Sequence, residues 1–302
     1  MTFSQEIKNE IANLKLSKKQ NLIKNELLGF AISNATTLDN NYIRFLSENI
    51  DIIARYKYII KRLTGIEVIE SQIENRLNEE KNLFEIYIDN VNDKKTICDF
   101  LCILSNSTKD ITVDINSFDQ DDKISFLRGI FLGSGYVCNP KIEYHLELIL
   151  DSKEKSNLVI NILKDFELNC KAISRNKQSV IYLKNSNLIS DFIGIIGSSI
   201  GVIHFEEERV IKEMNNNLNR VINCETANLN KAILNSQKQI EDIQKIKQKG
   251  KYDLLNDKLK QVCEAREENP DLSLNELANL IGISKSGLNN RLRKIKEIAN
   301  NI

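Results

Sequence analysis

Apolar and polar positions follow one pattern that occurs twice in the first two-thirds of the chain. In the first copy, apolar residues recur three and four positions apart where helices are predicted, and they mix with polar residues in the first predicted strand. The predicted elements are a helix over Leu22–Ala35, a strand over Asn41–Ser47, a helix over Asp51–Leu63, strands near Glu67–Ile73 and Leu83–Asp89, and a helix near Lys95–Leu104.

The second copy begins at Lys123 and repeats the order helix, strand, helix, strand, strand, helix. Its later elements are a strand through Ile142–Leu148, a helix over Ser152–Phe166, strands over Cys170–Ser174 and Ser179–Leu183, and a helix over Leu188–Ile196. Gly29 and Gly129 stand in the first helix of each copy, 100 residues apart. The repeated order therefore indicates duplication.

Each of these two glycines lies in a predicted helix, where glycine costs about 1 kcal/mol relative to alanine. Two helices approach most closely where neither has a Cβ atom in the way. A chance core glycine would explain either position alone. Because both occupy the same place in the repeat, Gly29 and Gly129 are predicted to form a helix–helix seam between the two halves.

The end of the chain carries start and stop signals for two short helices. Ser273 and Glu276 form a capping-box pattern that starts a helix running to Ile281. Gly282 is predicted to adopt the left-handed conformation of a tight turn, and Ser284 to cap the second helix. The apolar positions of that second helix fall on one stripe, made of Leu288, Leu292, Ile295 and Ala299.

The other face of the second helix is polar and basic, with five basic residues and no acidic one from Ser284 to Lys296. Ala278, Gly282 and Leu288 have the spacing of the small residue, turn glycine and apolar plug of a helix-turn-helix. An ordinary helical hairpin with a solvated basic face is the alternative. The predicted DNA-binding residues are Ser284, Lys285, Ser286, Asn289, Asn290, Arg291, Arg293, Lys294 and Lys296.

Their positions along the helix suggest two roles, because residues near the start of a recognition helix face base edges in the major groove. The candidates for base contacts are Lys285, Ser286, Asn289 and Asn290, and asparagine suits adenine. The candidates for phosphate contacts are Arg291, Arg293, Lys294 and Lys296. Upstream, helices are predicted over Thr226–Lys249 and Tyr252–Glu268.

Charge and composition fit a DNA-binding region confined to the C-terminal part. The whole chain has 42 basic and 42 acidic residues, whereas residues 227–302 have 14 basic and 10 acidic ones. The N-terminus lacks a signal-peptide pattern, and the longest weakly polar run, Phe192–Ile203, is too short to cross a bilayer. We therefore expect a cytoplasmic, nucleoid-associated protein with no membrane partner.

The six cysteines and two histidines show no metal-ligand spacing, and reduced, mostly buried thiols are expected. No metal, cofactor or small-molecule substrate is predicted.

The segments around Gly29 and Gly129 resemble the LAGLIDADG motif of homing endonucleases. The resemblance implies a two-repeat saddle with pseudo-twofold symmetry, in which the two motif helices end in carboxylates that hold divalent metal. Asn34 and Ser134 occupy those positions here. An amide and a hydroxyl are poor anchors for a hard dication, so the nuclease chemistry is expected to be lost.

The combination of saddle and helix-turn-helix resembles the WhiA family of bacterial DNA-binding regulators. The resemblance is most specific at Met1–Glu10, Asn219–Lys231 and Leu272–Ile295. It implies a transcription regulator or nucleoid-associated factor with roles in sporulation, cell division or chromosome segregation. Protein partners in transcription or cell division could bind through the saddle.

The expected fold is α+β, a LAGLIDADG-like saddle followed by an all-α domain. The expected parts are an N-terminal helix (1–20), two repeats (21–110 and 111–217), and a helical linker with the helix-turn-helix (218–302). The expected function is non-catalytic, sequence-specific binding of double-stranded DNA. Two alternatives remain, an active LAGLIDADG-type endonuclease and a scaffold for protein partners with a DNA tether.

Overall fold

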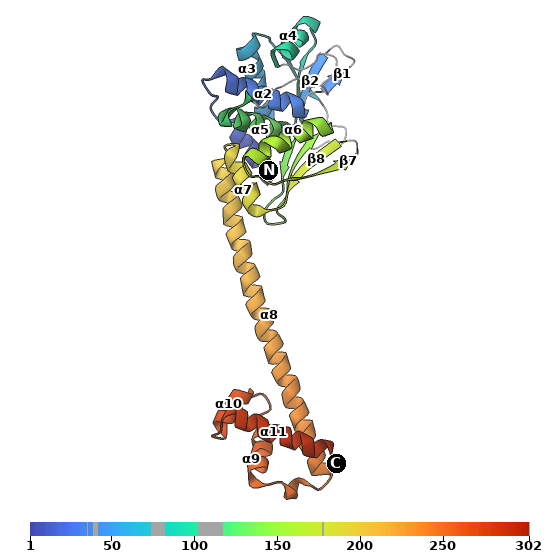
Figure 1. The fold of residues 1–302 in the computed structure, drawn as a ribbon, viewed down its shortest axis with the longest axis vertical. Helices are drawn as coiled ribbons and strands as arrows, with labels where there is room; N and C mark the ends of the chain where they lie inside the picture. The colour runs from blue at the N-terminus through green and yellow to red at the C-terminus, as the bar shows by residue number, and fades with distance from the viewer. Residues whose placement is uncertain (35, 39–41, 74–81, 102–116, 177, 302) are drawn as a thin grey trace. The chain divides into compact units, whose positions relative to one another are not determined.

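In a computed structural model, the chain forms two compact units, residues 1–212 (unit 1) and 213–302 (unit 2) (Figure 1). The structure describes residues 1–34, 36–38, 42–73, 82–101, 117–176 and 178–301. The boundary between the units falls inside helix α8 (Ser199–Gln248), which begins well before the start predicted from the sequence at Thr226.

Unit 1 contains the predicted duplication, which confirms the α+β fold class. The first repeat comprises α2 (Gln20–Asn34), β1 (Thr36–Leu38), β2 (Tyr42–Ser47), α3 (Ile50–Thr64), β3 (Ile69–Ile73), β4 (Leu83–Ile88) and α4 (Val91–Leu101). The second comprises α5 (Gln120–Ser134), β5 (Gly135–Val137), β6 (Leu146–Leu150), α6 (Lys153–Asp165), β7 (Lys171–Arg175), β8 (Gln178–Leu183) and α7 (Ser186–Ile195). Helix α1 (Phe3–Ala12) precedes both.

The sequence pattern did not predict the short strands β1 and β5, because three residues are too few to show an alternation of apolar and polar positions. The predicted start of strand β6 was also too early. The strand starts at Leu146, whereas Ile142 is 74% exposed. The last residue of the first predicted helix, Ala35, the first residue of the first predicted strand, Asn41, and the end of the predicted helix near Lys95–Leu104, at residues 102–104, lie outside the described residues.

Each repeat builds a four-stranded antiparallel sheet with the same strand order, β1-β2-β4-β3 in one and β5-β6-β8-β7 in the other. Phe45 pairs with Ile86 in the first sheet, and Leu148 pairs with Ile181 in the second. All four side chains are at most 1% exposed, so the central strands of both sheets face one hydrophobic core. Helix α1 joins that core through buried Phe3, Ile7 and Ile11.

Helices α2 and α5 pack against each other at the centre of unit 1 (Figure 1). A Cβ atom built on Gly29 would lie 2.1 Å from the backbone oxygen of Phe126. One built on Gly129 would lie 2.1 Å from the backbone oxygen of Glu26. The predicted glycine seam is therefore confirmed, and the two backbones meet where side chains are absent.

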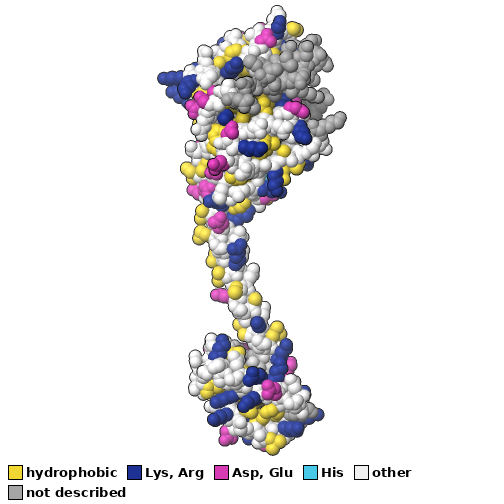
Figure 2. Space-filling view, viewed as in Figure 1, with side chains coloured by type: hydrophobic (Ala, Val, Ile, Leu, Met, Phe, Trp, Pro, Cys, Tyr) yellow, Lys and Arg dark blue, Asp and Glu magenta, His cyan; other side chains and the backbone are white. Residues whose placement is uncertain are grey.

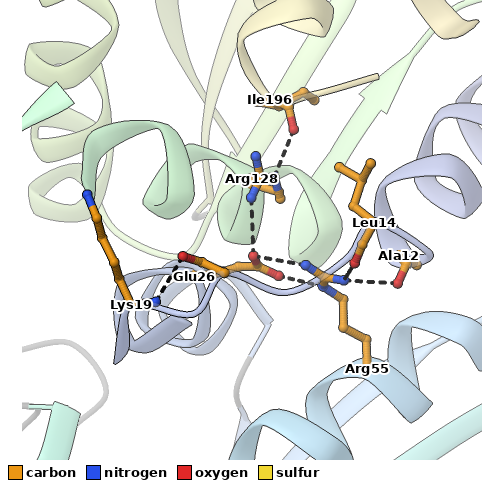
Figure 3. A network of polar contacts seen from close by, with 8 residues as sticks. Ala12, Leu14, Lys19, Glu26, Arg55, Arg128 and Ile196 are labelled. Atoms are coloured by element: carbon orange, nitrogen blue, oxygen red, sulfur yellow. Dashed lines mark hydrogen bonds and ion pairs between the residues drawn. The ribbon is translucent and has the colours of Figure 1, made fainter. Parts of the chain in front are cut away.

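A buried polar network sits beside this seam (Figure 3). Glu26 is 3% exposed, and its Oε1 lies 2.6 Å from Nε of Arg55 on α3. Its Oε2 lies 3.4 Å from Nη1 of Arg128 on α5, whose Nε donates to the carbonyl of Ile196. One carboxylate thus joins helices of both repeats.

The same arginine also anchors the N-terminal segment. Arg55 Nη1 donates to the carbonyls of Ala12 and Leu14, at 3.1 and 2.6 Å (Figure 3). Hydrogen bonds from a charged donor are the stronger class, and here one is buried and the other partly buried. The chain after α1 is therefore held against the two repeats.

Unit 2 is helical and has its own core. After α8 it contains a 3₁₀ turn η2 (Tyr252–Leu254), α9 (Asp257–Glu268), α10 (Leu274–Leu280) and α11 (Lys285–Asn300). The sequence predicted one helix over Tyr252–Glu268, but Asn256 Oδ1 accepts a hydrogen bond from the Leu259 amide and caps α9, which starts only at Asp257. Ile243 and Ile246 of α8 pack with residues of the three later helices.

Among the described cysteines, which are all free, Cys98, Cys138 and Cys263 are buried, Cys170 is half-buried and Cys224 is exposed. Cys102 lies outside the described residues. No helix in the described part of the chain combines the length and apolarity needed to cross a membrane.

The seam predicts that alanine substitutions at two helical glycines will differ strongly in their effect on the stability of unit 1. Gly29→Ala should destabilise unit 1 by roughly 3 kcal/mol or more, because a new methyl group would overlap backbone rather than a flexible side chain. Gly194→Ala, on α7, should be neutral or slightly stabilising, since its Cβ would meet only Val202 at 3.6 Å. Calorimetric unfolding of the full chain measures both, and equal melting temperatures for the two variants would contradict the seam.

Candidate nucleic-acid interface

The helix-turn-helix begins with a capping box. Ser273 Oγ accepts a hydrogen bond from the Glu276 amide at 3.3 Å, and Glu276 Oε2 accepts one from the Ser273 amide at 2.8 Å. Hydrogen bonding to the Glu276 carboxyl by the Ser273 side chain, and then by the Ser273 backbone amide, lowers the pKa of that carboxyl. The start of α10 is therefore held by the two residues that the sequence indicated.

The turn between α10 and α11 also has the predicted geometry. Gly282 has a φ of +70°, in the left-handed region that disfavours residues with a side chain. The Ile283 amide donates to the carbonyl of Ala278 at 2.9 Å, which closes the end of α10. Ser284 Oγ then accepts from the Gly287 amide at 3.1 Å and caps α11.

The predicted apolar stripe holds α11 on the core of unit 2. Leu288 and Ala299 are fully buried, and Leu292 and Ile295 are 7% and 1% exposed. Leu277 and Ala278 of α10 are buried in the same cluster. This packing sets which face of α11 is left for solvent.

The solvent face of α11 carries most of the predicted DNA-binding residues. They are all exposed: Ser284, Lys285, Ser286, Asn289, Asn290, Arg293, Lys294 and Lys296. Arg293 Nη2 donates to Asn290 Oδ1 at 3.4 Å, and Arg293 Nε lies 3.9 Å from Oε1 of Glu297 on the same helix. Figure 2 shows many Lys and Arg side chains and few acidic ones on the visible face of unit 2.

Arg291 has a protein contact, and Lys296 an acidic neighbour, that the sequence did not predict. Arg291 is half-buried, and its Nη1 donates to the Lys258 carbonyl on α9 at 3.4 Å. Lys296 is close enough to Asp242 on α8 to act on its carboxyl. Burial raises the pKa of Asp242, and the Lys296 charge opposes that rise. Both residues thus lie at the edges of the exposed face.

Sequence reasoning missed the residue that ties the helix-turn-helix to α8. Arg266 is 1% exposed, and its Nη1 donates to the carbonyls of Asn269 and Leu272, at 3.3 and 2.8 Å. It also reaches Ser236 Oγ of α8, which in turn donates to the Pro270 carbonyl at 2.6 Å. A signal was present, because Arg266 continues the buried spacing of Leu259, Val262 and Cys263.

In unit 1, the two positions of the degenerate motif serve structural roles. Asn34 Nδ2 donates to the carbonyls of Leu46 and Gly133, at 2.9 and 3.1 Å, and its Oδ1 accepts from the Leu46 amide. Ser134 Oγ donates to the carbonyl of Ile130, at 3.5 Å. Among the described residues, no three His, Cys, Asp or Glu side chains form a group that could hold a metal ion.

A duplicated saddle followed by a basic helix-turn-helix defines a class of DNA-binding proteins with a LAGLIDADG-like domain. Two domain families match the chain, the WhiA LAGLIDADG-like domain over residues 123–215 and the WhiA C-terminal HTH domain over 218–299. The probable cell division proteins WhiA of Staphylococcus carnosus and Staphylococcus haemolyticus are each 36% identical, over all of this chain and 98% of their own length. The chain belongs to the WhiA family.

Solved structures agree with this assignment. Full-length DUF199/WhiA from Thermatoga maritima matches with a TM-score of 0.62 and 27% identity, covering 100% of this chain and 99% of that one. The N-terminal LAGLIDADG domain of DUF199/WhiA matches with a TM-score of 0.52 and 28% identity, covering 65% of this chain and 92% of that one.

The left-handed turn predicts that substitutions at Gly282 will destabilise unit 2 to different degrees. Gly282→Ala should destabilise unit 2 by about 1–2 kcal/mol, because a Cβ disfavours the left-handed conformation. Gly282→Asn should cost less, since asparagine tolerates that conformation. Nothing lies within 4 Å of the added Cβ, so the cost is conformational rather than steric. Hydrogen exchange of the α10 and α11 amides measures the loss of stability in each variant. Equal protection in both variants would rule out the left-handed backbone conformation as its cause.

Proposed function

We propose that this protein is a non-catalytic, sequence-specific DNA-binding protein that reads double-stranded DNA with helix α11. The observation that carries the proposal is the exposed face of that helix, rich in lysine, arginine and asparagine, beside a turn held by two side-chain caps. A recognition helix presents its first turns to base edges in the major groove. Asn289 and Asn290 stand there with Lys285 and Ser286.

The remaining charges of α11 position the domain on the DNA backbone. Arg293 and Lys294 are exposed one turn further along and suit phosphate contacts. Arg291 and Lys296 contribute at the edge of the interface, where Arg291 must exchange or share its contact with the Lys258 carbonyl and the Asp242 carboxyl offsets part of the Lys296 charge. In this proposal, residues 218–302 are the DNA-binding part, and the two repeats, 21–110 and 111–217, together with the N-terminal helix, 1–20, are a scaffold.

The cellular role proposed for this chain follows its relatives, which are named probable cell division proteins. A regulator of transcription or a nucleoid-associated factor in the cytoplasm would link DNA binding to cell division, with sporulation or chromosome segregation as further processes. Partners from transcription or cell division would bind the saddle. Neither a cofactor nor a small-molecule substrate enters the proposal.

We predict no metal-dependent cleavage of DNA. Catalysis of this type needs carboxylates that fix divalent metal over the scissile phosphate, and Asn34 and Ser134 instead hydrogen-bond to backbone carbonyls. Purified protein incubated with plasmid and Mg²⁺ or Mn²⁺ should leave it intact. Cutting at defined sites that is lost on Asn34→Ala or Ser134→Ala would contradict the proposal.

Two substitutions on α11 should weaken DNA binding in different ways. Asn289→Ala should cost about 1–3 kcal/mol on cognate DNA and little on scrambled DNA, because a bidentate contact to one base is lost. Arg293→Ala should weaken both about equally and reduce the salt slope by about one unit. Neither change touches the buried stripe, so both variants should fold.

The measurement is binding of each variant to a specific and a scrambled duplex across a salt series. A uniform loss for both variants would show that Asn289 does not read sequence. In that case α11 would be a non-specific clamp.

A further inference from the structure

A second basic site lies on unit 2, beside the start of α11. A cleft of about 300 Å³ opens between α8 and the segment that leads into α10. Lys231, Arg266 and Lys285 line it, and no acidic residue does. Its other polar walls include the amide side chains of Asn228 and Asn275. The cleft is therefore positively charged and offers several N–H donors to an anion.

Arg266 is the unusual member of this lining. It is 1% exposed, and its guanidinium is held by two carbonyls and a hydroxyl rather than by a carboxylate. Within the part of the chain that the structure describes, its Nε atom is buried without a hydrogen-bond partner. Burial lowers the pKa of Arg266, but arginine stays charged in proteins at neutral pH.

Arg55, a buried arginine of unit 1, has the carboxylate partner that Arg266 lacks among the described residues. Arg55 is 7% exposed and forms a two-point contact with Glu26, at 2.6 and 3.1 Å. Burying a charge is costly unless an opposite charge compensates it. Arg266 has no such partner among the described residues, so an anion in the adjoining cleft would supply the compensation that Glu26 gives to Arg55.

We propose that this cleft binds a phosphodiester group of the DNA backbone, so that Lys231 of α8 and Lys285 of α11 hold the strand beside the base-reading helix. The inference rests on the proposed function. Its new element is that α8 takes part in DNA binding. Lys285 then acts on phosphate, and this replaces its place among the base-reading residues of the proposed function, which Ser286, Asn289 and Asn290 keep.

The location of the cleft favours DNA over a free anion. Lys285 is the first residue of α11, so a phosphate at the cleft adjoins the turn of the helix that faces base edges. Phosphate contacts from outside a recognition helix fix the register of a domain on the duplex. Lys231 is exposed on α8, where it is available to such a phosphate.

The test compares two lysines of the same helix in the full chain. Lys231→Gln should reduce the salt slope of DNA binding by about one unit and weaken binding roughly tenfold near 0.1 M salt, on cognate and scrambled duplexes alike. Lys238→Gln removes the same charge from another exposed position on α8, outside the cleft, and should change neither quantity. Lys231→Arg should restore most of the binding.

A duplex with one neutral methylphosphonate in place of a phosphate locates the contact. Scanned along a selected duplex, one position should weaken wild-type binding and have no further effect on Lys231→Gln, because the same contact is already lost. If no position behaves in this way, or if Lys231→Gln and Lys238→Gln lose equal affinity, the assignment to the cleft is overturned.

An experiment with inorganic phosphate distinguishes a DNA phosphate from a free anion as the ligand of the cleft. Should phosphate raise the melting temperature of the wild type but not of Lys231→Gln, while both bind DNA equally, the cleft holds a free anion and the DNA assignment is wrong. If Arg293→Ala impairs DNA binding and Lys231→Gln does not, the cleft assignment fails and the proposed function stands. A wild-type protein that binds no DNA would overturn both.

Discussion

The contact of α2 with α5 is the constraint on which unit 1 depends. Each helix presents a glycine to the backbone of the other, at a separation that leaves no room for a methyl group. Because the two helices begin the two repeats, their contact places both sheets around one core. The neighbouring carboxylate of Glu26 then attaches α3 and the N-terminal segment to the same seam.

Buried basic side chains have different partners in the two units. In unit 1, Glu26 compensates Arg55 and contacts Arg128, and buried Lys155 contacts Asp151. In unit 2, Arg266 donates to two carbonyls and the Ser236 hydroxyl, has no carboxylate partner among the described residues, and borders an electropositive cleft. The first arrangement is complete without a ligand. The second retains an unbalanced positive charge, a property suited to a polyanion surface.

The ends of the seam helices make structural contacts at the positions where the LAGLIDADG-like motif would carry acids. Asn34 donates to a carbonyl of its own repeat and to the Gly133 carbonyl of the other, so it joins the two halves at the position where the motif would carry an acid. In the proposed function, DNA recognition falls to unit 2, whose exposed helix face carries lysine, arginine and asparagine side chains suited to a major groove.

The sequence by itself determined the duplication, the glycine seam, the caps at Ser273 and Ser284, and the left-handed turn at Gly282. These features depend on spacing within a short segment, or on the same spacing written twice. Only the tertiary structure decided that Arg266 is buried without a carboxylate and that Lys231 and Lys285 share a cleft. It also turned Arg291 toward α9. These features depend on which residues, distant in the sequence, face one another. The packing of helices α8 to α11 determines this, and no local sequence pattern records it.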